Sequence, residues 1–351
     1  MLLVDKYRPK TLESLDYHLE MAEALKNLAT SNDFPHMLFY GPSGAGKKTR
    51  TMALLRQIFG PDVEKLRVEK KSFVIPNRST SVEITILVSP YHIELSLSEC
   101  MSNDRLVVQE VIKSIAYNQR IGSDSRKFKV IILNEVDVLT RAAQHALRRT
   151  MEKCMVNCRI FMNATSITRV IEALRSRCLC LRVGVPDHES ISSILQKIGK
   201  SECLNVPKEL AERISHRSDQ NLRRAVLMLE LAKLNQYPFS PDQLVQPADW
   251  ECFVDQLAKM IIEQQTTVRL LAIREKIYEL LTHCVPASLI LKTLAFALLE
   301  KVDDELKHQV ILLAAKYEHR MNLGLKPIFH LEAFIAKFME IYKKYWLSIA
   351  G

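Results

Sequence analysis

The order of apolar and polar positions divides the chain into two halves with different patterns. In the first half, short apolar runs predict β-strands at residues 36–40, 82–88, 128–133, 159–162 and 179–183. Helices are predicted between them at residues 15–30, 105–117 and 142–152. The segment at residues 4–9 is too short and mixed for a regular element. Strands that alternate with helices indicate an α/β fold with a parallel sheet.

After Pro186 the strand signals stop and only helical patterns follow. Three short amphipathic helices are predicted at residues 191–198, 210–214 and 221–234. Residues 235–247 hold three prolines and predict a hinge. About five further helices follow, including residues 267–282, 287–299 and 331–346. Several of these are apolar round much of their circumference, which indicates either contact with other subunits or a self-contained bundle.

One segment of the first half carries recognisable chemistry. The strand at residues 36–40 leads into the run Gly41-Pro42-Ser43-Gly44-Ala45-Gly46-Lys47-Lys48-Thr49, and a helix follows. Glycines allow backbone N–H groups to close on an anion at a helix N-terminus, so this run predicts a phosphate-binding loop in which Lys47 reaches the terminal phosphates. The next position normally holds the Ser or Thr that ligates Mg²⁺, but here it is Lys48. Thr49 is a poor substitute, because it points about 100° away on the helix.

A second metal-ligand position also departs from the P-loop motif by losing its ligand. The strand at residues 128–133 ends at Asn134-Glu135-Val136-Asp137, where a P-loop enzyme places the acids that hold Mg²⁺ and the attacking water. The first of these positions is the neutral Asn134, and Glu135 remains to orient a water molecule. The strand at residues 159–162 ends in Asn163, at the edge of the sheet where α/β proteins bind ligands. The sequence therefore predicts a nucleotide site that holds Mg²⁺ weakly or not at all.

The positive charge of the chain is concentrated in one region. The whole chain has 49 Lys/Arg and 40 Asp/Glu, a net charge of +9. Between Arg105 and Arg177 there are 14 Lys/Arg and 6 Asp/Glu, which leaves 35 and 34 in the rest. Arg105, Gln109 and Lys113 fall on one side of the helix predicted at residues 105–117. This surplus indicates either a polyanion-binding face or an ordinary solvated basic surface.

Composition adds two exclusions. No uncharged apolar run reaches the length of about 18 residues that a transmembrane helix needs, so a membrane partner is not expected. The eight cysteines are scattered through the chain, as in proteins of a reducing compartment. Cys154 and Cys158 have half the spacing of a zinc site, but no second Cys or His pair follows, and a structural metal is not expected.

Four segments together resemble a known family over essentially the whole chain. They are Val4-Asp5-Lys6-Tyr7-Arg8-Pro9, the loop from Gly41 to Thr49, Ala146-Leu147-Arg148-Arg149-Thr150-Met151-Glu152, and Ser176-Arg177-Cys178. They resemble the small subunits of replication factor C, the eukaryotic sliding-clamp loader, which is a five-subunit AAA+ assembly. Three features are similar to those of one family member whose own nucleotide site turns over inefficiently. They are the Gly-Lys-Lys-Thr run, the acid-poor Asn134–Asp137 box and the tail at residues 331–334.

The resemblance implies a fold and a set of partners. It implies an AAA+ nucleotide-binding domain at residues 1–185, a helical lid at 186–236, a hinge at 237–248 and a helical collar at 249–351 that holds the pentamer together. The implied cofactor is ATP or ADP, with Mg²⁺ weakly held. The implied partners are the other replication factor C subunits, the sliding clamp and primer-template DNA, in the nucleus.

The resemblance also implies roles for individual residues. Those lining the adenine pocket would be Val4, Tyr7, Arg8 and Pro9, with Leu15 and Asp16 nearby. Asn163 matches the first sensor and Arg223 the second. Arg177 matches the arginine finger that acts on a neighbouring subunit's nucleotide, and the helix from Arg105 would face the DNA backbone. One departure is Leu3, where the family usually has Trp, and this predicts looser packing of the N-terminal segment.

Three readings of the site stay open from the sequence. In the first, the chain binds nucleotide, hydrolyses little of it and completes a neighbour's active site. In the second, it is an active ATPase that holds its metal unusually, through water and Glu135. In the third, it is a DNA-binding protein in which the phosphate loop is only structural. Separately, the alternative to an arginine finger at Arg177 is an ordinary surface arginine.

Overall fold

The computed structural model describes residues 1–30, 34–74, 81–96, 104–106, 108–109, 128–154, 158–324 and 326–350. The chain divides into two compact units, Met1–Val245 and Gln246–Gly351. Helix α9 ends at Asn235 and α10 begins at Asp249, so the boundary lies in the proline-containing stretch between them. Residues 104–106 and 108–109 are helical, and Lys113 lies outside the described residues.

The first unit contains a seven-stranded sheet in the order β2-β3-β4-β5-β6-β1-β7. The strands are β1 (His36–Tyr40), β2 (Arg67–Val74), β3 (Ser81–Val88), β4 (His92–Ser96), β5 (Lys129–Asn134), β6 (Cys158–Ala164) and β7 (Cys178–Arg182). The predicted parallel arrangement holds from β4 to β7, whereas β2 and β3 add an antiparallel hairpin at one edge. Strand β2 escaped prediction because it is an exposed edge strand rich in charged residues, a common protection against unwanted pairing.

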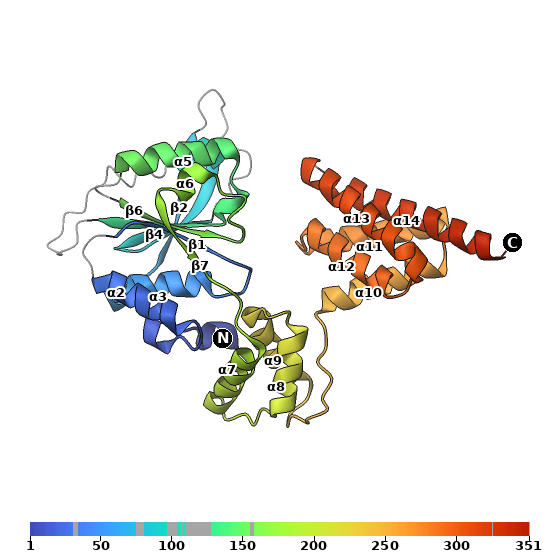
Figure 1. Ribbon diagram of the computed structural model, residues 1–351, viewed down its shortest axis with the longest axis horizontal. Coiled ribbons are helices and arrows are strands. Elements are labelled where there is room, and N and C mark those ends of the chain that lie inside the picture. The colour runs from blue at the N-terminus through green and yellow to red at the C-terminus, as the bar shows by residue number, and fades with distance from the viewer. Residues whose placement is uncertain are drawn as a thin grey trace. The chain divides into compact units, whose positions relative to one another are not determined.

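Helices cover both faces of this sheet. Figure 1 shows α2 (Leu19–Thr30) and α3 (Lys47–Phe59) on one face and α5 (Arg141–Cys154) and α6 (Glu172–Arg175) on the other. Successive strand residues point to opposite faces, so Leu38 belongs to the core that includes Leu147 of α5. Its neighbour Phe39 belongs to the core that includes Leu54 of α3. Strand β1 is thus buried on both sides and fixes the phosphate loop that follows it.

The N-terminal segment is more ordered than its sequence predicts. Residues Leu3–Lys6 form a single helical turn, α1, and Leu12–Ser14 form a 3-10 turn, η1. The expectation of no regular element there was therefore wrong, because Leu3 is buried in the core of the three helices α7 (His188–Ser201), α8 (Lys208–Arg217) and α9 (Leu222–Asn235). Helix α2 begins at Leu19, later than predicted, because residues 15–18 are not helical and His18 has a left-handed φ of +54°. Two further 3-10 turns are η2 (Pro61–Glu64) and η4 (Val136–Val138).

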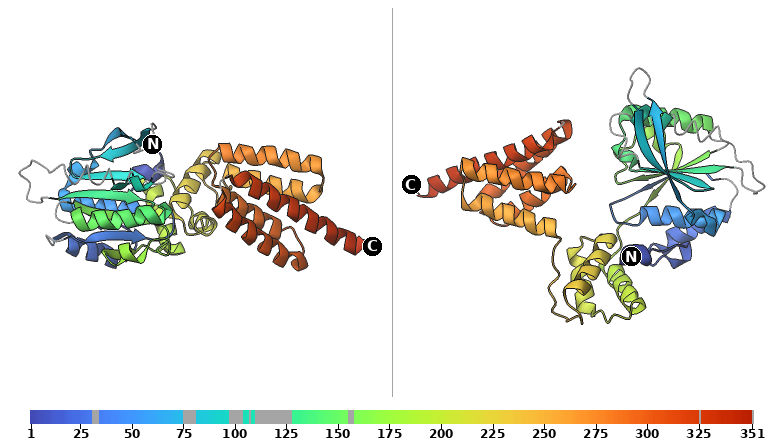
Figure 2. Two further views of the ribbon diagram at one scale, coloured as in Figure 1. Left: turned by 90° about the horizontal axis from the view of Figure 1, so that it is seen from above. Right: turned by 180° about the vertical axis from the view of Figure 1, so that it is seen from behind.

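The described part of the second unit is a helical bundle. Its helices are α10 (Asp249–Glu263), α11 (Thr267–Thr282), α12 (Ala287–Leu299), α13 (Asp304–Leu323) and α14 (Pro327–Ala350), which Figure 2 shows side by side in orange and red. The predictions for α11 and α12 match, and α14 starts earlier than predicted because Pro327 is well suited to the first turn of a helix. Leu294, Phe334 and Phe338 are fully buried in the bundle core. Among the described residues, every helix is too short or too polar to span a membrane.

Candidate nucleotide-binding site

The loop between β1 and α3 has the geometry of a phosphate-binding loop. Gly41 has a φ of +153°, and a Cβ added there would lie 1.9 Å from the carbonyl oxygen of Val183. Gly46 precedes α3 in the left-handed region, with a φ of +81°. Both positions therefore need glycine, and loops of this kind direct the N–H groups at the start of the following helix toward a bound anion.

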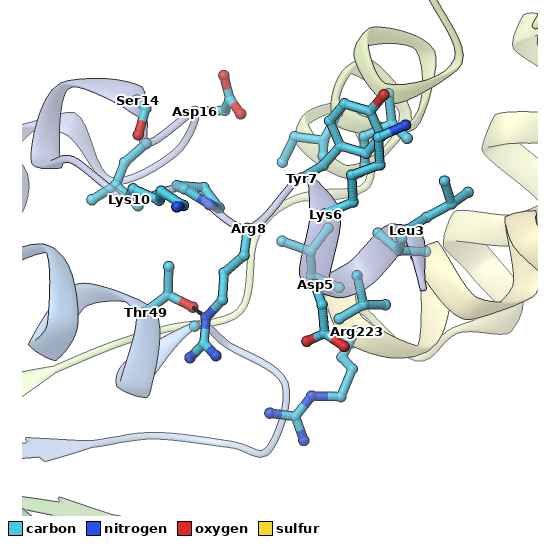
Figure 3. Close-up of a pocket in the computed structure, with 18 of the residues that line it drawn as sticks. Leu3, Asp5, Lys6, Tyr7, Arg8, Lys10, Ser14, Asp16, Thr49 and Arg223 are labelled. Atoms are coloured by element: carbon cyan, nitrogen blue, oxygen red, sulfur yellow. Dashed lines mark hydrogen bonds between the residues drawn. The ribbon is translucent and has the colours of Figure 1, made fainter. Parts of the chain in front are cut away.

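A cavity of about 810 Å³ lies beside this loop. It is lined by α1, η1, the start of α3 and the lid helices α7 and α9 (Figure 3). The structure brings together eleven of the predicted site residues along its wall: Val4, Tyr7, Arg8, Pro9, Leu15, Asp16, Gly44, Gly46, Lys48, Thr49 and Arg223. The other predicted binding residues are not among those that line the cavity; they lie in the loop, at the start of α3 and in β6: Gly41, Pro42, Ser43, Ala45, Lys47 and Asn163.

The N-terminal segment is tied to the lid around the cavity. Glu202, just after α7, accepts a hydrogen bond of 2.6 Å from the Tyr7 hydroxyl and forms an ion pair with Lys6. These hydrogen bonds lower the pKa of the Glu202 carboxyl. The backbone N–H of Leu3 donates to Glu230 on α9 at 3.2 Å. The cavity is therefore closed by contacts between segments about 200 residues apart in sequence.

Basic side chains converge on the cavity from several elements. Arg8 donates from Nε to the Thr49 hydroxyl at 3.1 Å, and Figure 3 shows Arg8 and Arg223 extending to the same side of the cavity. Burial lowers the pKa of Arg8, and the charge of Arg223 lowers it further. Burial also lowers the pKa of Lys47. These desolvated cations would be stabilised by a bound anion.

Lys47 turns back on its own loop. Its ammonium donates to the carbonyl oxygens of Gly41 at 2.6 Å and Pro42 at 2.8 Å. Its predicted contact with terminal phosphates stays a prediction. A rotation of the side chain away from these two carbonyls would bring that contact about.

A continuous polar network fills the place of the metal ligands. The Lys48 ammonium forms an ion pair with Glu94 of β4, and Glu94 is only 3% exposed. The same Glu94 oxygen accepts from the Asn134 amide at 2.6 Å. Asn134 in turn accepts from Asn163 at 2.9 Å, and the Asn163 oxygen accepts from the Thr51 hydroxyl at 3.2 Å. The two positions that depart from the motif are thus joined to each other through Glu94.

This network does not fit a magnesium ion. Mg²⁺ requires oxygen ligands in octahedral geometry, and Lys48 places a cation where the Ser or Thr ligand belongs. Two like charges 4 Å apart repel by about 4 kcal/mol at an effective dielectric constant of 20, and a divalent ion doubles this cost. The Thr49 hydroxyl is already the acceptor for Arg8. We therefore derive no catalytic step through a metal at this site.

Two site residues were missed from the sequence. Glu94 lies in β4, where polar and apolar residues alternate; this alternation predicts that the polar side chains face solvent, whereas the structure buries Glu94. Arg50 of α3 is completely buried and donates to the carbonyls of Tyr17 and Ala45 at 3.0 and 3.2 Å and to the Tyr17 hydroxyl at 3.2 Å. Its spacing four residues after Gly46 places it under the loop, and this was the only sequence signal for it.

The remaining predicted residues lie outside the cavity wall. Glu135 is exposed and adopts a left-handed conformation at the end of β5. Arg177, between α6 and β7, is held by Glu152 of α5 through contacts of 2.9 and 2.8 Å, and it donates to the Ala173 carbonyl at 3.0 Å. Arg105 is exposed and Gln109 is half-buried.

Known proteins match this chain from end to end. Replication factor C subunit 3 from Bos taurus and from Homo sapiens are each 50% identical to it over 345 residues, which cover 98% of this chain and 97% of each relative. Replication factor C subunit 5 from Oryza sativa is 49% identical over the full length of both chains. This chain belongs to the replication factor C family.

Family models match separate parts of this replication factor C chain. The C-terminal domain of replication factor C subunit 3 matches residues 250–346, and the RCF1/5-like AAA+ ATPase lid domain matches residues 193–234. The delta subunit of DNA polymerase III matches residues 17–187. Among solved structures, the Thermotoga maritima RuvB Holliday junction branch migration motor aligns with a TM-score of 0.49 at 15% identity, over 77% of this chain and 85% of that one. The predicted fold class, an α/β AAA+ domain followed by a helical lid and an all-helical domain, is confirmed.

Proposed function

We propose that this chain is a nucleotide-binding subunit of a clamp loader and that it hydrolyses little of its own nucleotide. The observation that carries this proposal is the network of Lys48, Glu94 and Asn134, which replaces the metal ligands beside a cavity rich in basic side chains. The loop and its cations supply what a phosphate needs. The two positions that hold metal ligands in a P-loop enzyme are occupied by Lys48 and Asn134.

The cavity provides a place for each part of an adenine nucleotide. The base would lie among Val4, Tyr7, Pro9 and Leu15, with Arg8 and Asp16 at its edges. The phosphates would meet the loop from Gly41 to Thr49, where Lys47 releases the Gly41 and Pro42 carbonyls to contact them. Asn163 and Arg223 would sense the terminal phosphate, Asn163 from behind the loop and Arg223 from the lid. Both ATP and ADP satisfy this arrangement.

We expect the isolated chain to bind ATP and ADP but to show no turnover above the background of the Lys47→Ala variant. Lys47→Ala should abolish binding, because it removes the loop's own phosphate contact, whereas the exposed Lys26→Ala should leave binding intact. Equilibrium titration with a fluorescent nucleotide and a phosphate-release assay measure the two quantities. Strong Mg²⁺-dependent turnover that disappears in Lys47→Ala would contradict the proposal.

An active ATPase with unusual metal coordination is the alternative. The position of Glu135 favours this alternative, because its exposed carboxylate lies at the end of β5, where an attacking water would be oriented. In that case Glu135→Gln should remove measurable turnover of the isolated chain. A chain that binds no nucleotide at all would favour the third reading, in which the loop is only structural.

The proposed assembly consists of the other replication factor C subunits, which bind a sliding clamp and primer-template DNA in the nucleus. The helical unit supports association, because it exposes large apolar side chains such as Phe296, Leu312 and Trp346. In this assembly Arg177 would act as an arginine finger on the nucleotide of a neighbouring subunit. Its position on an exposed turn between α6 and β7 is compatible with that role.

We also propose that the basic surplus contacts DNA phosphates through Arg105, Gln109 and Lys113. Phosphate contacts carry no sequence information, so binding should be salt-dependent and insensitive to sequence. Each of Arg105→Ala and Lys113→Ala should lower the slope of log affinity against log salt by roughly 0.9 in the assembled loader. Lys26→Ala is the control for the loss of one exposed cation. An unchanged slope in both variants would remove these residues from the DNA-binding surface.

A further inference from the structure

We propose that the ammonium group of Lys48 takes the place of Mg²⁺, so that this subunit binds the phosphates of its nucleotide without a metal ion. The inference rests on the proposed nucleotide site and specifies the form of the ligand: free ADP or ATP, not its magnesium complex. Lys48 would be the binding residue, and Glu94 would position it.

The start of α3 is an unfavourable place for cations unless anions are nearby, and Glu94 is the anion that the structure places beside Lys48. Lys47 and Lys48 are the first two residues of α3, where the helix dipole places partial positive charge. Cations at this end of a helix are destabilising. A bound phosphate would reverse the sign of this effect. Lys48 also lines the cavity, so its ammonium is available to a ligand there.

Glu94 fixes the direction of this ammonium. The carboxylate is almost completely buried, and its Oε1 atom receives both Lys48 and the Asn134 amide. A buried carboxylate with a lysine partner serves that lysine and not a divalent ion, which would have to displace it. The Oε2 atom is buried without a hydrogen bond among the described residues, so both Lys48 and Asn134 are held through Oε1.

The amide and hydroxyl groups near Lys48 already have hydrogen-bond partners. The Asn134 and Asn163 amides bond to each other, and the Thr49 hydroxyl receives Arg8. Within the described residues, no three His, Cys, Asp or Glu side chains gather into a group that could hold a metal. By contrast, Lys48, Arg8 and Arg223 all reach the cavity wall. The chain itself therefore supplies the positive charge that Mg²⁺ supplies elsewhere.

The test compares nucleotide affinity in Mg²⁺ with affinity in EDTA, using the full chain and fluorescent ADP and ATP analogues. The wild-type chain should give the same dissociation constant in both buffers. Lys48→Thr should weaken binding in EDTA by about tenfold, equivalent to about 1.4 kcal/mol. Lys48→Thr combined with Asn134→Asp should recover affinity only when Mg²⁺ is present. Lys48→Arg, which keeps the charge, should remain indifferent to Mg²⁺, and Lys26→Thr is the matched lysine control.

The possible failures are distinguishable. If the wild-type chain binds nucleotide in neither buffer, the proposed function itself is wrong. If it binds at least about tenfold more tightly with Mg²⁺ than with EDTA, the nucleotide site stands and the role of Lys48 is overturned. The wild-type comparison decides this point even if a variant fails to fold. Glu94→Gln adds a separate readout: a positioning role predicts weaker binding in EDTA, whereas a metal-ligand role for Glu94 predicts loss of binding only in Mg²⁺.

Discussion

Replacing Arg177 with alanine should reduce ATP hydrolysis at the neighbouring subunit's site by about 10³-fold, the lower end of the effect of an arginine finger. A guanidinium is always charged and places two parallel N–H groups on phosphate oxygens, so it stabilises the charge of a transferring phosphoryl group. The structure holds this guanidinium in a defined orientation through Glu152 and the Ala173 carbonyl. The exchange of Glu152 for a phosphate would be a local movement of one side chain.

The measurement requires the assembled loader with its other ATPase sites disabled. Arg177→Ala should leave the nucleotide affinity of its own subunit unchanged, because Arg177 is not among the residues that line that cavity. Arg177→Lys should lose most of the rate, since lysine keeps the charge but not the forked geometry. Arg169→Ala removes another exposed arginine from the same domain and should have no effect. Unchanged turnover in a correctly assembled Arg177→Ala ring would reduce Arg177 to a surface charge.

The fold was predictable where one local pattern decided the structure. Helices α11 and α12 match their predicted bounds because their apolar spacing is regular and a cap or proline marks the start of each. Strand β1 was predictable because both of its faces are buried. Strands β2 and β4 were not, since β2 is an exposed edge and β4 carries the buried polar residues His92 and Glu94. Polar and apolar residues alternate in β4, and this pattern predicts solvent exposure for the polar positions that the structure buries.

The site was predictable from its motif but not from its charge balance. The glycines and Lys47 identify the loop, and Lys48 and Asn134 identify what is missing from it. The sequence does not reveal that both departures meet at Glu94, because the three residues lie on different elements. Arg50 was missed for the same reason: Tyr17, which accepts hydrogen bonds from it through both its carbonyl and its hydroxyl oxygen, lies 33 residues away in the sequence. Long-range polar contacts of this kind have no periodicity along the chain.

A second large effect is expected on the stability of the first unit in acid, because two buried histidines resist protonation in the folded state. His36 of β1 and His92 of β4 are 3% and 1% exposed. Burial, with the charge of Arg159, lowers the pKa of His36 to about 4. Burial also lowers the pKa of His92 to about 4, opposed by Glu94 and assisted by Lys48. The His36 Nδ1 atom accepts the N–H of Ile160 at 3.0 Å, a bond that requires that nitrogen to be unprotonated.

The direction of the change in stability follows from the protonation of these histidines in the unfolded and folded states. In the unfolded chain a histidine titrates near pH 6.5, so above that pH both states are neutral and the two side chains add no pH dependence. As the pH falls from 6.5 towards 4, the unfolded chain takes up two protons that the folded chain does not, and stability is lost. Each histidine contributes about 1.4 kcal/mol per pH unit in this window. Between pH 7 and pH 5 the first unit should therefore lose roughly 4 kcal/mol of unfolding free energy from this pair.

Hydrogen exchange at the β1 and β4 amides, measured at pH 7 and pH 5 and corrected for intrinsic rates, reports this loss directly. Both tryptophans, Trp250 and Trp346, lie in the second unit, so their fluorescence during urea unfolding serves as an internal reference that should shift less.

His36→Gln and His92→Gln should each remove about half of the pH dependence, whatever they do to stability at pH 7. His145→Gln, on the exposed side of α5, is the control for the loss of a histidine. A pH dependence that persists in the double variant would assign acid sensitivity to the carboxylates instead, because paired carboxylates also lose their stabilising contribution as they become protonated.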